Sequence, residues 1–152
     1  MEILDATIAD ASAIIKLQKL SYLSEAAIYN DFSIQPLTQS VEQLIADFNH
    51  KTILKAVRDE RIIGSVNGSM KENNCLIGRL MVHPDFQGWG IGSRLMEAME
   101  ARFPTAQSWE LFTGEMSLRN IHMYEQLGYR IVRKEPFEGT HFNIVIMRKV
   151  RQ

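Results

Sequence analysis

The sequence predicts a mixed α+β fold. We expect a mostly antiparallel central sheet flanked by about four helices. Strand-like apolar segments follow one another directly in the middle of the chain. Segments whose apolar residues recur every three or four positions lie on either side of them. The expected order is β-α-α-β-β-β-α-β-α-β-β.

The N-terminal part is expected to hold a short strand and two helices. The strand is EILDAT, and Thr7 starts TIAD, which resembles a capping box opening a helix that runs to about residue 23. Residues 24–40 form a connector of mixed composition. Ser40 and Gln43 then make a second capping box, which predicts the start of the next helix.

Three strands are expected next, in TILKAV, RIIGSVNGSM and CLIGRLMV, joined by the polar turns RDE and KENN. A helix with one apolar stripe follows from Ile91 and is stopped by Pro104. SWELFT is another strand. The next helix has Ser117 as its N-cap and ends at Gly128, before a closing hairpin formed by YRIVRKEPF and THFNIVIMRK.

Composition limits the classes of function. A chain of 152 residues suits one domain, here residues 1–152. A net charge of −1 offers no basic field for nucleic acid. The single cysteine, Cys75, excludes an internal disulfide. The N-terminus lacks a signal-peptide pattern and no apolar run is long enough to span a membrane, so we expect a cytoplasmic protein.

Three glycines, Gly88, Gly90 and Gly92, lie in QGWGIG between a strand and a helix. A helix N-terminus presents unpaired N–H groups and a partial positive charge. Glycines let more of these groups point inward, which predicts an anion site, most naturally for phosphate. The glycines alone also fit a tight turn with close packing of strand on helix. The spacing matches neither a P-loop nor GxGxxG.

The pattern Gln87-x-x-Gly90-x-Gly92, after an apolar strand ending in VHP, resembles motif A of the GNAT superfamily of N-acyltransferases. Residues 117–132, SLRNIHMYEQLGYRIV, are similar to the second signature of that family. There an Asn precedes a Tyr by four positions and LGY follows. The resemblance extends over essentially the whole chain, including the order of elements.

The resemblance implies a role for each matched residue. The family's motif A backbone binds the pyrophosphate of acetyl-CoA, which assigns cofactor binding to Gln87, Gly88, Trp89, Gly90, Ile91, Gly92 and Ser93. Met81 and Val82 match the strand that pairs with the pantetheine arm. Asn120 and Tyr124 match positions near the pantetheine and the thioester sulfur.

The chemistry of amine acylation makes further demands. A primary amine has a pKa near 10, so only about one molecule in a thousand is neutral at pH 7 and a proton must be removed. A free strand N–H, such as that of Val82, would stabilise the oxyanion. The Tyr124 hydroxyl is suited to protonate the leaving thiolate. The alternative for Tyr124 is a core tyrosine that covers the sheet.

The general base is not defined by the sequence. Some relatives carry a Glu early on the fourth strand, whereas NNCLIG contains no carboxylate. Candidates for lining the acceptor pocket are Glu25, Asp31 and Glu115, each of which also fits a solvated surface charge. His83 is a candidate proton relay or a structural residue before Pro84. Glu25 is our choice for an acceptor-facing catalytic residue.

Other features predict what the site lacks. The histidines have no ligand-like spacing, so we expect no metal. Cys75 reads as a buried apolar thiol, which suits direct transfer without an acyl-enzyme.

The expected function is transfer of an acetyl group from acetyl-CoA to an amine. Acids and aromatics in residues 24–40 and 134–141 favour a small cationic amine over a protein amine. The alternative is a non-catalytic acyl-CoA-binding or sensor module, and the intact Asn120 and Tyr124 favour the enzyme. We expect no nucleic-acid or membrane partner. A homodimer is compatible with the sequence.

Overall fold

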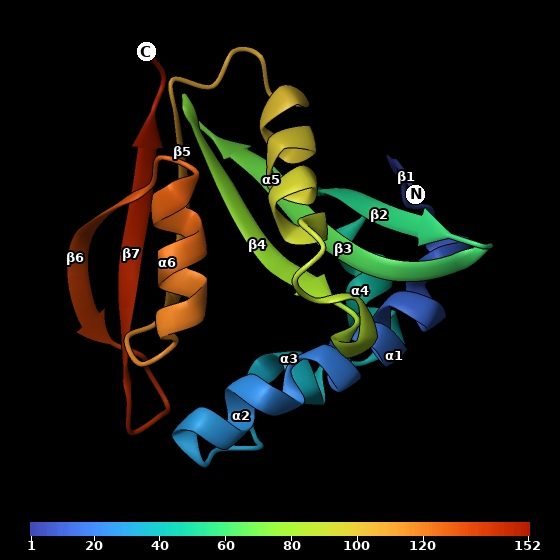
Figure 1. Ribbon diagram of the computed structural model, residues 1–152, viewed down its shortest axis with the longest axis horizontal. Helices are drawn as coiled ribbons and strands as arrows, with labels where there is room; N and C mark the ends of the chain where they lie inside the picture. The colour runs from blue at the N-terminus through green and yellow to red at the C-terminus, as the bar shows by residue number, and fades with distance from the viewer.

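The computed structural model describes residues 1–152 and contains one sheet of seven strands in the order β1-β2-β3-β4-β5-β7-β6 (Figure 1). All neighbouring strands are antiparallel except β4 and β5, which are parallel. The strands are β1 (Glu2–Asp5), β2 (Thr52–Arg58), β3 (Arg61–Lys71), β4 (Asn74–Val82), β5 (Ser108–Gly114), β6 (Arg130–Pro136) and β7 (Asn143–Val150).

Helices cover parts of both faces of the sheet. They are α1 (Ala11–Ser21), α2 (Leu23–Tyr29), α3 (Gln35–Thr38), α4 (Val41–Asp47), α5 (Ile91–Ala101) and α6 (Leu118–Gln126). Two short 3₁₀ helices, η1 (Ile8–Asp10) and η2 (Pro84–Phe86), precede α1 and α5. The larger core cluster joins α5 and α6 to the sheet, and the smaller one joins α1 and α4 to the opposite face.

The predicted mixed α+β class is confirmed, and both capping boxes are present. Thr7 and Asp10 cap η1, and Ser40 and Gln43 cap α4. The connector at 24–40 differs from the expectation because it contains α2 and α3. Helix α2 nearly continues α1, and it ends where Asn30 adopts a left-handed conformation with φ of 48°.

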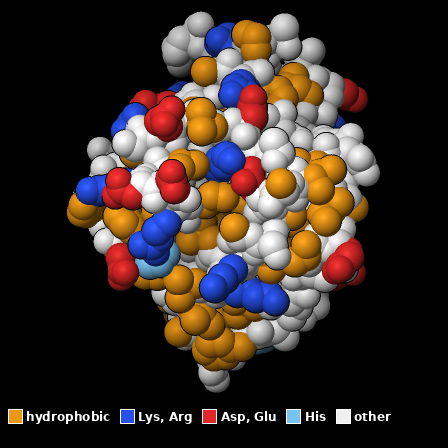
Figure 2. Space-filling view, turned by 90° about the vertical axis from the view of Figure 1, so that its right-hand side faces the viewer, with side chains coloured by type: hydrophobic (Ala, Val, Ile, Leu, Met, Phe, Trp, Pro, Cys, Tyr) orange, Lys and Arg blue, Asp and Glu red, His pale blue; other side chains and the backbone are white.

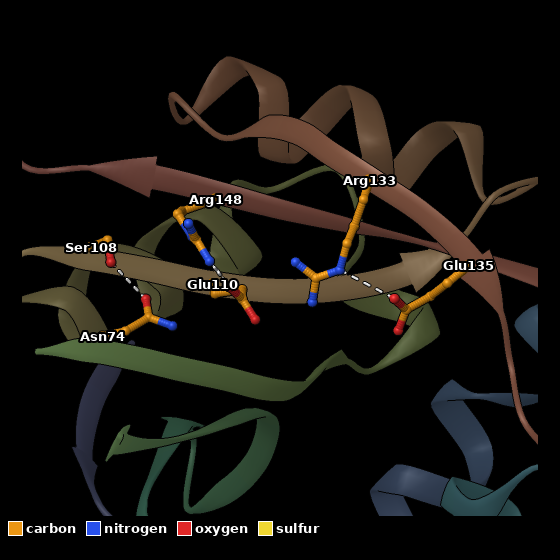
Figure 3. A network of polar contacts seen from close by, with 6 residues as sticks. All are labelled: Asn74, Ser108, Glu110, Arg133, Glu135 and Arg148. Carbon is orange, nitrogen blue, oxygen red and sulfur yellow. Dashed lines mark hydrogen bonds and ion pairs between the residues drawn. The ribbon is translucent and has the colours of Figure 1, made fainter. Parts of the chain in front are cut away.

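The two halves of the sheet part between β4 and β5. These strands pair only where Asn74–Leu76 meets Ser108–Glu110, and they diverge beyond it (Figure 1). The Ser108 hydroxyl donates to Asn74 Oδ1 over 2.7 Å at the paired end (Figure 3). On the same side of the sheet, Arg148 Nη2 donates to Glu110 Oε1 over 2.6 Å and links β7 to β5. The strands separate beyond this paired end.

The surface carries mixed charge. On the face seen in Figure 2, acidic and basic side chains are interspersed among apolar ones, in keeping with a net charge of −1. No helix has both the length and the apolar character needed to cross a membrane.

Candidate active site

The loop between β4 and α5 has an unusual backbone. Gly88 and Gly90 have φ values of 84° and 78°, a region that residues with a side chain rarely adopt. A Cβ atom added at either glycine would meet no other atom within 4 Å. The requirement for glycine is therefore conformational at both positions, and the space above them is open.

The same loop presents unpaired hydrogen-bond donors. The first main-chain bond of α5 runs from Arg94 N–H to Gly90 O over 3.1 Å. No main-chain N–H in residues 87–93, which we call the glycine loop, donates a hydrogen bond within the protein. Because these amides surround the N-terminus of a helix of 11 residues, their partial charges add to that of the helix dipole. This arrangement fits a diphosphate.

Gly92 has a separate reason to be glycine. A Cβ atom there would lie 3.3 Å from Met123 Sδ, so its absence lets α5 approach α6 closely. The sequence left open a close packing of strand on helix, whereas the tightest contact at Gly92 is between two helices. Gly88 and Gly90 show no such close packing.

Two arginines flank the glycine loop, and sequence reasoning missed both. The Arg58 guanidinium lies 4.8 Å from the centre of the Trp89 ring, which is 60% exposed. Arg119 Nη1 donates to Gln87 Oε1 over 3.2 Å. They come from β2 and α6, so only the fold brings them to the loop. Both add positive charge beside the unpaired amides.

The end of β4 faces the gap in the sheet. His83 N–H donates to Ile63 O on β3, so the N–H of the preceding Val82 points away from β3, toward the gap. The Val82 carbonyl accepts from the Ser21 hydroxyl over 3.2 Å. The Tyr22 hydroxyl donates to Leu80 O over 3.1 Å. The side chain of Met81 is buried in the cluster with α1.

Tyr124 lies on α6 and is buried. Burial, followed by the nearby Tyr22 and Glu25, raises the pKa of its phenol, so the hydroxyl stays protonated at neutral pH. Its ring also packs edge-on against Tyr129, with centroids 6.1 Å apart. Tyr124 is therefore a buried residue whose hydroxyl keeps its proton at neutral pH.

Asn120 and Glu25 are in direct contact. Asn120 Nδ2 donates to Glu25 Oε1 over 2.7 Å, and the Ser117 hydroxyl donates to Glu25 Oε2 over 2.6 Å. Glu25 lies on α2, within the segment expected to be a connector. Ser117 precedes α6 as predicted, but its side chain bonds Glu25 instead of capping the helix.

The other candidate acids and the histidine have local partners. Hydrogen bonds from the side chain and then the backbone N–H of Ser33 lower the pKa of exposed Asp31. Glu115 is paired with Lys134 over 3.1 Å. His83 Nδ1 accepts from Asp85 N–H over 3.0 Å. These contacts show no arrangement for proton transfer.

Cys75 is a core residue, and the residue types that bind metal ions do not cluster. Cys75 is fully buried in the larger core cluster, and burial raises the pKa of its thiol to about 12. No three His, Cys, Asp or Glu side chains gather in a way that would hold a metal ion.

Solved structures share this fold over nearly the whole chain. One is the PaiA N-acetyltransferase from Thermoplasma acidophilum in complex with coenzyme A, with a TM-score of 0.81, 20% identity, and coverage of 99% of this chain and 98% of that one. Another is the ribosomal-protein-alanine N-acetyltransferase from Brucella melitensis, with a TM-score of 0.76, 18% identity, and coverage of 99% and 100%.

Curated relatives match a shorter part of their own length. The UPF0157 protein YqkA of Bacillus subtilis is 27% identical over 126 residues, which are 83% of this chain and 36% of that protein. The amino-acid acetyltransferase of Mannheimia succiniciproducens is 30% identical over 122 residues, which are 72% of this chain and 27% of that protein. The chain thus spans about a third of the length of these relatives or less.

The family comparison agrees with the fold and with the two sequence signatures. The family described as Acetyltransferase (GNAT) domain matches residues 18–151, from α1 to the end of β7. The chain therefore belongs to the GNAT acetyltransferase family, whose members transfer an acetyl group from acetyl-CoA.

Proposed function

We propose that this protein transfers an acetyl group from acetyl-CoA directly to an amine. The observation that carries the proposal is the glycine loop, whose unpaired amides follow directly on a strand that has parted from its neighbour. A diphosphate on the loop would leave the rest of the donor to extend into the gap between β4 and β5. The complex of the related PaiA enzyme with coenzyme A supports this assignment.

Donor binding in this proposal uses main-chain and charged groups. The amides of residues 87–93 bind the diphosphate, with Arg58 and Arg119 beside them. Met81 and Val82 offer main-chain groups to the pantetheine arm. The Asn120 amide bonds the same arm from the α6 side.

The transfer step follows from the positions of Val82 and Tyr124. The amine nitrogen attacks the thioester carbon, and the oxygen that gains negative charge accepts a hydrogen bond from Val82 N–H. The C–N bond forms, the C–S bond breaks, and the amine loses a proton to solvent water. Tyr124 donates its proton to the departing thiolate and regains one from solvent.

Direct transfer is favoured because the chain offers no good nucleophile near the site. Its sole cysteine, Cys75, is buried in the core with a pKa raised to about 12.

The acceptor in this proposal is a cationic amine, with Glu25 as the group that attracts it. Both Glu25 oxygens accept from neutral donors, and no Lys or Arg nitrogen lies within 4.0 Å. The charge of this carboxylate is therefore not neutralised. The names of two relatives, an amino-acid acetyltransferase and a ribosomal-protein-alanine N-acetyltransferase, put α-amino groups among the acceptors to test.

The test is a panel of amines incubated with acetyl-CoA, including polyamines, amino acids and peptides with a free N-terminus. Released thiol gives the rate, and mass spectrometry identifies the product and any acetylated protein. We expect one amine class to be acetylated without a stable acetyl-enzyme. Tight acetyl-CoA binding with no product from any amine would instead support the sensor module.

A further inference from the structure

Two helical segments that face each other carry polar residues at the same spacing. Tyr22, Glu25 and Tyr29 follow an i, i+3, i+7 pattern at the end of α1 and along α2. Ser117, Asn120 and Tyr124 follow the same pattern at the start of α6 and along it. The order is reversed, because Tyr29 contacts Ser117 while Glu25 contacts Asn120.

The hydrogen bonds between these segments run in one direction. Met116 N–H can only donate, and it donates to the Tyr29 oxygen over 3.1 Å. The Ser117 hydroxyl donates to Glu25, so it accepts the proton of the Tyr29 hydroxyl, 2.6 Å away. The sequence Met116, Tyr29, Ser117, Glu25 is therefore a chain of donors that ends on the carboxylate.

The Tyr29 side chain is held by packing contacts as well as by these hydrogen bonds. A Cβ atom on Gly114 would lie 1.9 Å from the Tyr29 oxygen, so only glycine leaves room for the hydroxyl. Phe142, in the loop between β6 and β7, stacks on the Tyr29 ring with centroids 4.2 Å apart. Tyr29 and Ser117 are 6% and 2% exposed, so water does not compete freely for their hydroxyls.

The chain sets the orientation of Asn120. Because Nδ2 donates to Glu25 Oε1, the amide oxygen is left free as an acceptor on the other side of the side chain. A Glu25 carboxylate released from Ser117 would turn, and the Asn120 amide would turn with it. One carboxylate thus connects the group proposed to bind the donor with the charge proposed to attract the acceptor.

We propose that Tyr29 and Ser117 are positioning residues, which hold the Glu25 carboxylate in place and through it fix the Asn120 amide. The role of Glu25 toward an amine rests on the proposed function, whereas the orientation of Asn120 does not. A purely structural contact between α2 and α6 would affect folding stability alone. A positioning role affects the amine step more than stability, and it acts only through Glu25.

The main experiment compares Ser117→Ala with Ser108→Ala. Each change removes one serine hydroxyl that donates to a side chain, and Ser108 lies at the paired end of β4 and β5. For Ser117→Ala we expect kcat/KM for the amine to fall about tenfold, as for a lost bond to a charged group. Ser108→Ala should retain wild-type kcat/KM. The acetyl-CoA Kd should rise about threefold in Ser117→Ala, where the Asn120 amide is no longer fixed, and stay unchanged in Ser108→Ala. The Tm should change similarly in both variants.

A double-mutant cycle tests whether Ser117 acts through Glu25. In a Glu25→Gln background, Ser117→Ala should cost less than about twofold in kcat/KM, because the charge to be positioned is gone. Ser117→Thr, which keeps the hydroxyl, should restore most of the activity. Tyr29→Phe should give a smaller loss of about threefold, because the Ser117 bond to Glu25 remains. Equal losses in both backgrounds, or none, would overturn the proposal.

A readout without turnover separates this inference from the proposed function. The side-chain amide of Asn120 gives two proton NMR signals, and the signal of the hydrogen bonded to Glu25 should exchange slowly with solvent in the wild type and rapidly in Ser117→Ala. If no amine is acetylated but this signal behaves as expected, the positioning holds and the function is wrong. Unchanged exchange in Ser117→Ala would overturn the positioning, whatever the activity.

Discussion

The two ends of the site satisfy their polar groups in opposite ways. The glycine loop leaves its main-chain N–H groups unpaired, and Gly88 and Gly90 give it its left-handed backbone conformation. The α2–α6 network, made of Glu25, Tyr29, Met116, Ser117 and Asn120, pairs its polar groups within the protein. Tyr29 and Ser117 are buried, and Glu25 and Asn120 are half-buried. The loop is prepared for a ligand that supplies acceptors, whereas the network is already complete.

This difference changes what a mutation reports. Water already solvates the loop donors, so altering the loop should weaken ligand binding with little effect on stability. Removing a partner from the network leaves a buried group unpaired, which costs folding stability as well as function. Comparing the two effects in one variant therefore identifies the end of the site to which a residue belongs.

The largest effect is expected for Tyr124→Phe, which removes only the hydroxyl. If that hydroxyl protonates the thiolate, kcat should fall about 100-fold, the lower end for a positioned proton donor. The acetyl-CoA Kd and the Tm should change little, because the ring stays packed against Tyr129. Steady-state kinetics and a melting curve decide. Full turnover with a markedly lower Tm would make Tyr124 a core residue only.

Gly90→Val tests the role of the glycine loop. A β-branched residue at a φ of 78° is strained, so the loop should change shape and acetyl-CoA should bind about 30-fold more weakly. Gly139→Val is the matched control, because Gly139 has a φ of 82° and equally open surroundings in the loop between β6 and β7. Calorimetry on both variants should show the loss of affinity in Gly90→Val alone. Equal affinities would remove the anion-site assignment.

Glu25→Gln tests the negative charge in the α2–α6 network. The amide keeps the size of the side chain and loses the negative charge, so the KM for a cationic amine should rise about tenfold. The acetyl-CoA Kd should stay within about twofold. Glu115→Gln provides the control, because Glu115 is already neutralised by Lys134. An acceptor KM that moves equally in the two variants would assign Glu25 no specific contact with the amine.

The smallest effect on turnover is expected at Cys75. Cys75→Ala should keep the wild-type kcat, because the thiol takes no part in the reaction. The native thiol holds its proton up to a pKa of about 12, whereas the unfolded thiol loses it near 9. The free energy of unfolding should therefore fall as the pH rises from 9 to 12. Denaturant titrations should show a shallower fall for Cys75→Ala, and parallel curves would contradict the assigned pKa.

The glycine loop could be predicted from the sequence because its residues are neighbours in the chain. Gln87, Gly90 and Gly92 form a local pattern, and the unpaired amides follow from a helix that begins there. The order of the strands, and of the helices outside residues 24–40, followed from periodicity in the same way.

The α2–α6 network could not be predicted in this way. Tyr29 lies 88 residues from Ser117, and Glu25 lies 95 residues from Asn120. In the sequence Gly114 looks like an ordinary end of a strand, and only the structure shows that the Tyr29 hydroxyl packs against it. The helical spacing of Tyr22, Glu25 and Tyr29 is visible in the sequence. It indicates a shared helix face only where this segment is helical, and we predicted a connector for residues 24–40.

The parting of β4 and β5 has a mechanical consequence. β4 and β5 form only three residue pairs, so the two halves of the sheet are hinged at the end where Ser108 bonds Asn74. A ligand lying along the gap would act as a brace between them. Amide hydrogens on β4 and β5 should then exchange more slowly together when acetyl-CoA is bound, and the sheet should unfold as a more cooperative unit.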